Sequence, residues 1–210
     1  LVGSEMCIRD SNSGIAGKYS IALGKRSVAG AESDGQPGQG QFAAGWMSKA
    51  LGDYSVAIGR ENITRAQRSG RNVDQLFLGS KNVAHLALNE TGYDRQTSIG
   101  HNNKIKGGEA VILGTDNQLQ GSRGTVIGHD NVLGDSNASG IVGSFTGAAG
   151  SVIVGIDNIV PSRSNYVFGR HNVLHHGTAR GIENYVFGSV NKVGNNADQV
   201  LIFGNQNAVF

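Results

Sequence analysis

Histidines and aspartates recur just after glycines, and both residue types bind metal ions. His101 and His129 each directly follow a glycine, and His171 stands two residues after one. The aspartates two places after a glycine are Asp116, Asp130 and Asp157. A zinc site needs three or four converging ligands, whereas a whole sequence unit separates His101 from His129. One acid per unit offers too few oxygens for calcium. We therefore expect no metal site and no cofactor.

The remaining reactive residues do not form a catalytic pattern. The acids are dispersed, and no two recur as a pair within one sequence unit, as a glycoside-cleaving site would require. The chain contains no nucleophile elbow, phosphate-binding loop or H-E-x-x-H motif. We therefore expect a protein that is not an enzyme.

The glycines that precede these residues belong to a repeat. Twelve short apolar segments each end in a glycine, most commonly fourteen residues apart, and asparagine follows three places later in nine of them. The twelve glycines are Gly24, Gly45, Gly59, Gly79, Gly100, Gly114, Gly128, Gly143, Gly155, Gly169, Gly188 and Gly204. This register predicts a stack of about twelve coils of about fourteen residues.

Each unit predicts a strand, a tight turn and a second short strand. Val, Ile and Phe enrich the apolar segments, as in β-strands. Glycine supplies positive φ in the G-x-x-N turn, and asparagine tolerates left-handed backbone. The turn-forming asparagines that we expect include Asn117, Asn131, Asn158 and Asn172. Stacked coils would pair as parallel strands about 4.8 Å apart, which predicts an all-β parallel solenoid.

Alternation along the apolar strand predicts which side chains face outward. We expect residues one and three places before the glycine to fill the interior, together with the residue five places after it, such as Leu119, Leu133, Val160, Leu174 and Val193. The residue two places before the glycine would then lie outside and join neighbouring chains. In the later repeats it is Ile112, Val126, Ile141, Ile153, Val167, Val186 and Ile202.

An apolar outer face of that length needs a cover. Strands that are apolar throughout are typical of sheets buried on both faces, and no stretch of this sequence has the periodicity of a covering helix. The simplest partner is another copy of the chain. We therefore expect an obligate homo-oligomer with parallel chains around one axis.

Composition excludes several other classes of protein. The chain has 210 residues, 33 glycines, two prolines and a net charge of +2, so neither collagen nor a nucleic-acid-binding surface is indicated. One cysteine allows no internal disulfide, and no apolar run is long enough for a transmembrane helix. Residues 1–11 match no repeat and resemble vector- or adapter-derived sequence, so we expect the folded domain to span residues 12–210.

Two repeat copies resemble a known family. SIALG at Ser20–Gly24 and SVAIG at Ser55–Gly59 are similar to the head repeat of trimeric autotransporter adhesins, the YadA-like head. The resemblance implies a left-handed parallel β-roll of which three copies pack around a threefold axis. Later copies drift to VILG, VIVG and YVFG, and the chain stops inside a repeat at Phe210, which favours a fragment.

Membership of that family implies a function without catalysis. The relatives are bacterial surface proteins that attach to extracellular-matrix proteins, host cells or other surfaces. The resemblance therefore implies an outer-membrane location at the cell surface, with membrane contact only through an anchor domain outside this sequence.

Four longer repeat spacings predict loops at one corner of the coil, where binding surfaces of solenoids often lie. The ligand-binding residues that we expect there are Arg65, Arg68, Arg71 and Arg180, with Trp46 as an aromatic contact beside the Gly45 turn. Two alternatives stay open: a phage tail-fibre β-solenoid that binds a receptor, and a right-handed β-helix enzyme that acts on polysaccharide.

Overall fold

The computed structural model describes residues 14–15, 17–30, 39–64, 74–84, 95–134, 150–161, 164–174, 183–194 and 197–210. All regular elements in this part of the chain are β-strands, and it contains no helix that could span a membrane. The chain divides into two compact units, Leu1–Lys104 and Ile105–Phe210, here called the N-terminal and C-terminal units. The all-β prediction is confirmed.

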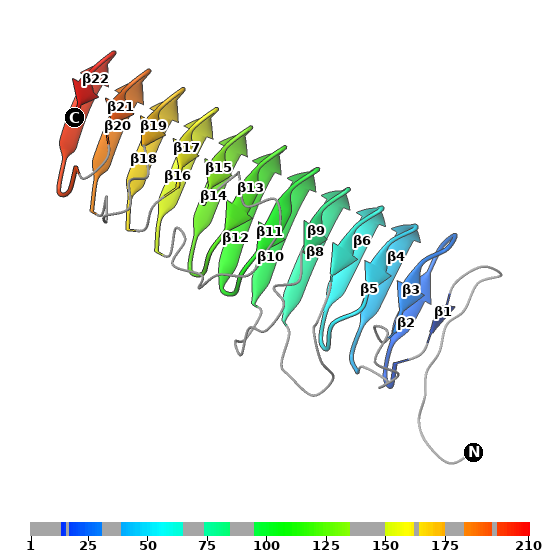
Figure 1. Ribbon diagram of the computed structural model, residues 1–210. Helices are drawn as coiled ribbons and strands as arrows, with labels where there is room; N and C mark the ends of the chain where they lie inside the picture. Colours follow the sequence, from blue (N-terminus) through cyan, green and yellow to red (C-terminus); the bar gives the residue numbers. More distant parts are fainter. Residues whose placement is uncertain are drawn as a thin grey trace, which may run out of the picture. The chain divides into compact units, whose positions relative to one another are not determined.

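Each coil of the N-terminal unit contributes one long and one short strand (Figure 1). The long strands stack in parallel in chain order as one sheet: β2 (Ile21–Leu23), β4 (Phe42–Trp46), β6 (Val56–Arg60), β8 (Gln75–Ser80) and β10 (Gln96–His101). The short strands form the second sheet: β1 (Gly14–Ile15), β3 (Val28–Ala29), β5 (Lys49–Ala50), β7 (Ile63–Thr64) and β9 (Val83–Ala84). A further short strand, β11 (Lys104–Lys106), starts at the last residue of this unit.

The C-terminal unit repeats the same plan. Its long-strand sheet holds β12 (Ala110–Thr115), β14 (Thr125–His129), β16 (Val152–Ile156), β18 (Tyr166–Arg170), β20 (Tyr185–Ser189) and β22 (Leu201–Asn205). Its short-strand sheet holds β13 (Gln118–Gln120), β15 (Val132–Leu133), β17 (Ile159–Val160), β19 (Val173–Leu174), β21 (Lys192–Val193) and β23 (Ala208–Val209). The register joins turn glycine to turn glycine, as in Gly155 with Gly169 and Gly169 with Gly188.

Eleven of the twelve predicted repeats correspond to long strands, five in the N-terminal unit and six in the C-terminal unit. The prediction of twelve coils is not confirmed. Gly128 of β14 pairs directly with Gly155 of β16, so no strand from the intervening repeat SGIVG lies between them. Ile141 and Gly143 of that repeat lie outside the described residues. The apolar pattern of SGIVG resembles that of the other repeats, but the direct pairing of β14 with β16 leaves no place for its strand between them.

The predicted directions of the long-strand side chains are wrong. The residue two places before the glycine lies inside the coil, with 0–5% of its surface exposed at Ile112, Val126, Ile153, Val167, Val186 and Ile202. Residues one and three places before the glycine, such as Val152 and Val154, instead lie on the outside. The inward direction predicted for the short strands is confirmed, because Leu119, Leu133, Val160, Leu174 and Val193 are all buried.

Buried polar side chains explain this reversal. The residue four places before the glycine is Ser, Gln or Asn in most coils, and it also points inward. These side chains join one coil to the next: Gln75 Nε2 donates to Gln96 Oε1 at 3.2 Å, and the backbone amide of Asn184 donates to Asn165 Oδ1 at 3.0 Å. A polar residue that is satisfied in such a ladder need not face solvent. The alternation therefore runs opposite to the one that polarity alone suggests.

The asparagines three places after the glycine form a second buried ladder. Asn62 Nδ2 donates to the carbonyls of Ile58 at 2.7 Å and of Gly79 in the next coil at 2.8 Å. Asn62 Oδ1 accepts hydrogen bonds from the backbone amide and Nδ2 of Asn82, at 3.0 and 3.1 Å. The same pattern joins Asn131 to Asn158 in the C-terminal unit. These side chains fasten each coil to the next.

The predicted left-handed asparagines are not the left-handed residues of the turn. Positive φ falls on the glycine and on the residue two places after it, such as Glu61 (φ 57°), Asp116 (φ 56°) and Asp130 (φ 53°). The glycine requirement is confirmed. At Gly155 φ is 146°, and a Cβ atom would overlap the carbonyl oxygen of Gly169 in the next coil.

Replacing Gly155 by alanine should therefore separate neighbouring coils. We expect G155A to lower the free energy of unfolding by at least about 3 kcal/mol, since backbone strain alone costs about 1–3 kcal/mol. The matched control is G150A, because Gly150 also has positive φ (70°) but the nearest atom to its Cβ, Ser164 Oγ, is 4.0 Å away. That control should lose about 1–2 kcal/mol. Equal losses in urea denaturation would contradict the stacking.

The asparagine ladder gives a second prediction. Asn131→Ala removes the oxygen that accepts from the backbone amide and Nδ2 of Asn158, and the Nδ2 group that donates to the Gly155 carbonyl. Loss of these hydrogen bonds should cost roughly 2–4 kcal/mol. Asn131→Ser should lose about half as much. Serine already stands at this place in the N-terminal unit, where Ser48 Oγ donates to the Gly59 carbonyl at 3.0 Å. If the two variants unfold at the same denaturant concentration, the bond to the glycine carbonyl does not stabilise the stack.

Candidate binding surfaces

The outer face of each long-strand sheet is apolar at two positions per coil. The residues directly before the turn glycine are half-buried or exposed, with 39% exposure at Ile58 and Ile99 and 37% at Ile127 and Phe168. The residues three places before it are half-buried in most coils, as at Val56, Val111 and Val152, and exposed at Tyr185 and Leu201. Polar exceptions among these outer positions are Thr97 and Thr125. We call this surface the outer face.

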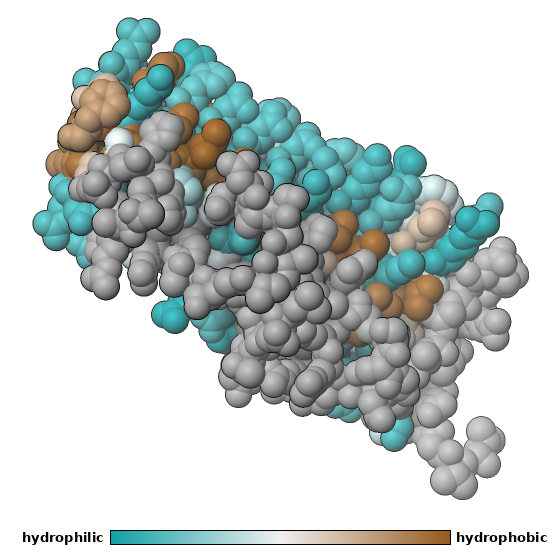
Figure 2. Space-filling model, in the orientation of Figure 1, coloured by the Kyte–Doolittle hydropathy of each residue, from teal (hydrophilic) through white to brown (hydrophobic). Residues whose placement is uncertain are grey.

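The outer face is aromatic at the C-terminal end of the C-terminal unit. Phe168, Phe187 and Phe203 stack in parallel, with ring centroids 5.2 and 4.8 Å apart. Tyr166 and Tyr185 stack beside them at 4.9 Å. Exposure rises to 70% at Phe203, and hydrophobic surface gathers at this end of the unit (Figure 2). Such a stripe needs a partner surface if it is to be removed from water.

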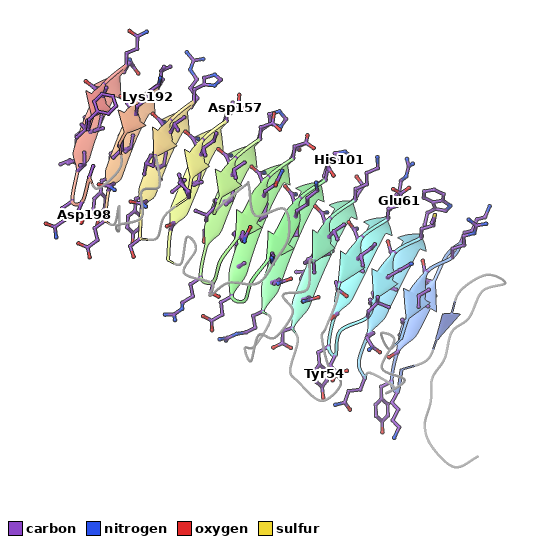
Figure 3. The ribbon with its side chains drawn as sticks, viewed as in Figure 1. Tyr54, Glu61, His101, Asp157, Lys192 and Asp198 are labelled. Carbon is purple, nitrogen blue, oxygen red and sulfur yellow. The ribbon has the colours of Figure 1, made fainter. Side chains whose placement is uncertain are left out.

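A second surface follows the glycine turns along one edge of each unit. We call it the turn ridge, and it consists of the residues one and two places after each turn glycine. Figure 3 shows Glu61 and His101 projecting from this edge of the N-terminal unit and Tyr54 from the opposite edge. Asp157 and Asp198 lie on opposite edges of the C-terminal unit in the same way. The ridge holds the histidines and aspartates singled out in the sequence, namely His101, Asp116, His129, Asp130, Asp157 and His171.

Trp46 lies on the turn ridge and is 38% exposed. The guanidinium carbon of Arg60, from the next coil, stands 4.9 Å from the centroid of the Trp46 ring, and Arg60 Nε is 3.3 Å from Glu61 Oε1. The four arginines proposed with Trp46, namely Arg65, Arg68, Arg71 and Arg180, lie outside the described residues. The structure thus adds Arg60 to the candidate binding residues. The long repeat spacings did not indicate Arg60, because it directly follows the turn glycine Gly59.

The histidines after the turn glycines have different neighbours. In the N-terminal unit, His101 Nδ1 is 2.6 Å from Ser80 Oγ. In the C-terminal unit, His129 Nε2 is 2.9 Å from Asp130 Oδ2 and His171 Nδ1 is 3.4 Å from Asp157 Oδ2. Metal-binding atoms of Asp116, His129 and Asp130 lie within 4.8 Å of one another. The sequence does not reveal this mixed cluster when the spacing of histidines and the spacing of aspartates are considered separately.

Comparison with protein families gives one match. Residues 42–62 match the YadA head domain repeat in two copies, a stretch that covers β4, β5 and β6. The match includes SVAIG at Ser55–Gly59 and confirms the resemblance to the YadA-like head for these residues. The comparison with curated proteins returned no match.

Proposed function

Because residues 42–62 carry two YadA head domain repeats, we propose that the chain is the head of a bacterial surface adhesin that works as a homotrimer. The observation that carries this proposal is the apolar outer face. Residues 12–210 form the head, and residues 1–11 are a leader foreign to it. The head lies outside the cell, and an anchor domain beyond this sequence holds it in the outer membrane.

Burial of the outer face supports assembly. Each coil exposes or half-exposes two side chains there, mostly aliphatic or aromatic. Complete burial of an aliphatic or aromatic side chain contributes up to about 1.5–3 kcal/mol. Half-buried residues gain less, yet the gain recurs in every coil. A copy of the chain running in parallel has the same rise per coil, so each apolar pair meets an equivalent pair along the whole contact.

Adhesion would use the surfaces that trimer formation leaves free. The turn ridge with Trp46 and Arg60 is one of them, and the segments with Arg65, Arg68, Arg71 and Arg180, which the long repeat spacings predict as loops, are the others. A large aromatic ring beside a guanidinium group is typical of residues that dominate protein interfaces. We therefore propose extracellular-matrix proteins or host-cell surface molecules as partners, with no catalytic step.

Molar mass by light scattering tests the assembly. Wild type should have about three times the 21.9 kDa mass of one chain. Ile127→Asp places a charge on the outer face and should yield a monomer whose strand content is unchanged by circular dichroism. The control Gln118→Asp, on an exposed position of the short-strand sheet, should remain a trimer.

Ile153→Asp separates this account from the opposite strand orientation. Ile153 has no exposed surface, so the charge would be buried inside the coil and should unfold the C-terminal unit. A folded I153D monomer, or an I127D trimer, would overturn the assignment of the outer face.

Binding to immobilised matrix proteins tests the adhesive surface. We expect Trp46→Ala to weaken binding about tenfold or more, as loss of an interface anchor worth at least about 1.4 kcal/mol would. The matched control is Tyr54→Ala, because Tyr54 is 47% exposed on the opposite edge and should leave binding unchanged. Equal binding by wild type and W46A trimers would remove Trp46 from the adhesive surface.

A further inference from the structure

The geometry points to a divalent transition-metal site on the turn ridge of the C-terminal unit, formed by Asp116, His129 and Asp130. This site is independent of the proposed adhesion. One imidazole nitrogen and two carboxylate oxygens, all within 4.8 Å of one another, form a ligand set of the zinc class. It is the one group of three metal-binding side chains within the described ranges.

The stacking of two turns brings the three ligands together. Thr115 pairs with His129 in the sheet, so the residues that follow them, Asp116 and Asp130, occupy the same place in adjacent turns. The amide of Asp130 donates to the Thr115 carbonyl at 3.1 Å, which joins the two turns directly. Asp116 and Asp130 both have left-handed backbone, with φ of 56° and 53°. The backbone therefore fixes the positions of the Cβ atoms of Asp116 and Asp130.

The distances suit a metal ion after small side-chain rotations. Two ligands of a tetrahedral zinc ion lie about 3.4 Å apart, because each is about 2.0–2.1 Å from the metal. His129 Nε2 and Asp130 Oδ2 are 2.9 Å apart and need to open slightly. Asp116 needs to approach from within 4.8 Å. The His129 and Asp130 side chains are 50% and 46% exposed, so rotation meets little packing, and water can complete the coordination shell.

Charge favours a cation at this place. Asp116, Asp130 and Asp157 stand at equivalent positions of three successive turns, since His129 pairs in turn with Ile156. Carboxylates in register on neighbouring strands repel one another. Asp130 and Asp157 each pair with a histidine, at 2.9 and 3.4 Å. A divalent ion between Asp116, His129 and Asp130 would neutralise two of the carboxylates.

The neighbouring turns show why the site is confined to the two adjacent turns that contain Asp116 and His129–Asp130. The turn after His129–Asp130 has Ile156 where the histidine stands, so Asp157 has no imidazole on its own strand end. In the N-terminal unit, His101 is followed by Asn102, whose amide carries no charge. Magnesium and calcium prefer all-oxygen ligands, so the imidazole selects zinc, nickel, cobalt or copper.

Isothermal titration with Zn²⁺ in millimolar Mg²⁺ tests the site, using untagged protein in a Cys7→Ser background to remove the one thiol. One Zn²⁺ should bind per chain. His129→Gln and Asp116→Asn should each weaken binding at least about tenfold, since even a residue that only orients a ligand contributes about 10–100-fold. The control Asp157→Asn removes a carboxylate from the same ridge but no ligand, and should change affinity less than about threefold.

Two results would overturn the proposal. One is wild-type protein that binds no Zn²⁺ while circular dichroism shows it folded. The other is H129Q protein that binds Zn²⁺ as tightly as wild type. A selective shift of the His129 imidazole signals in NMR spectra on addition of one equivalent of Zn²⁺ would support it without any substitution.

Discussion

Each coil in both units depends on one contact between adjacent turns. The turn glycine has no Cβ, so the carbonyl of the next coil's glycine can occupy that space, as Gly169 does beside Gly155. A buried polar side chain three places after the glycine then donates to the same carbonyl, as Asn158 does at 2.9 Å. Steric access and hydrogen bonding therefore act on the same oxygen. Both are needed for close stacking of the coils, because a Cβ atom would block the carbonyl and a buried carbonyl without a donor is costly.

This contact determines the surfaces of the protein. The turn, with left-handed backbone at Gly155 and Asp157, restarts the alternation, because Ile153 and Asn158 both point inward although they are five residues apart. Ile153 faces inward, whereas Val152 and Val154 face outward. The same turn directs the residues after the glycine, such as Trp46 and His129, to the ridge. The outer face, for which we propose contact with copies of the chain, and the ridge, for which we propose contact with ligands, are thus two consequences of one turn.

The sequence predicted the strands, the stacking and the turn glycines, because each depends on a local pattern that repeats. It did not predict the side-chain directions of the long strands, since Gln75 and Asn165 are polar yet buried, and their bonds to equivalent residues in the next coil permit this. The extra repeat at Gly143 had the right letters, but pairing between β14 and β16 excludes it. The Asp116–His129–Asp130 cluster depends on contacts between turns, which a search within one repeat position does not reveal.

Side-chain amide exchange of the asparagines, followed by NMR spectroscopy, tests this central contact most directly. The carboxamides of the buried ladder, such as Asn62, Asn131 and Asn158, should exchange with D₂O far more slowly than that of Asn205, which is exposed. Slow exchange at the ladder positions requires that both carboxamide hydrogens are bonded away from water. If those carboxamides exchange as fast as that of Asn205 in the folded protein, the ladder does not hold the coils together.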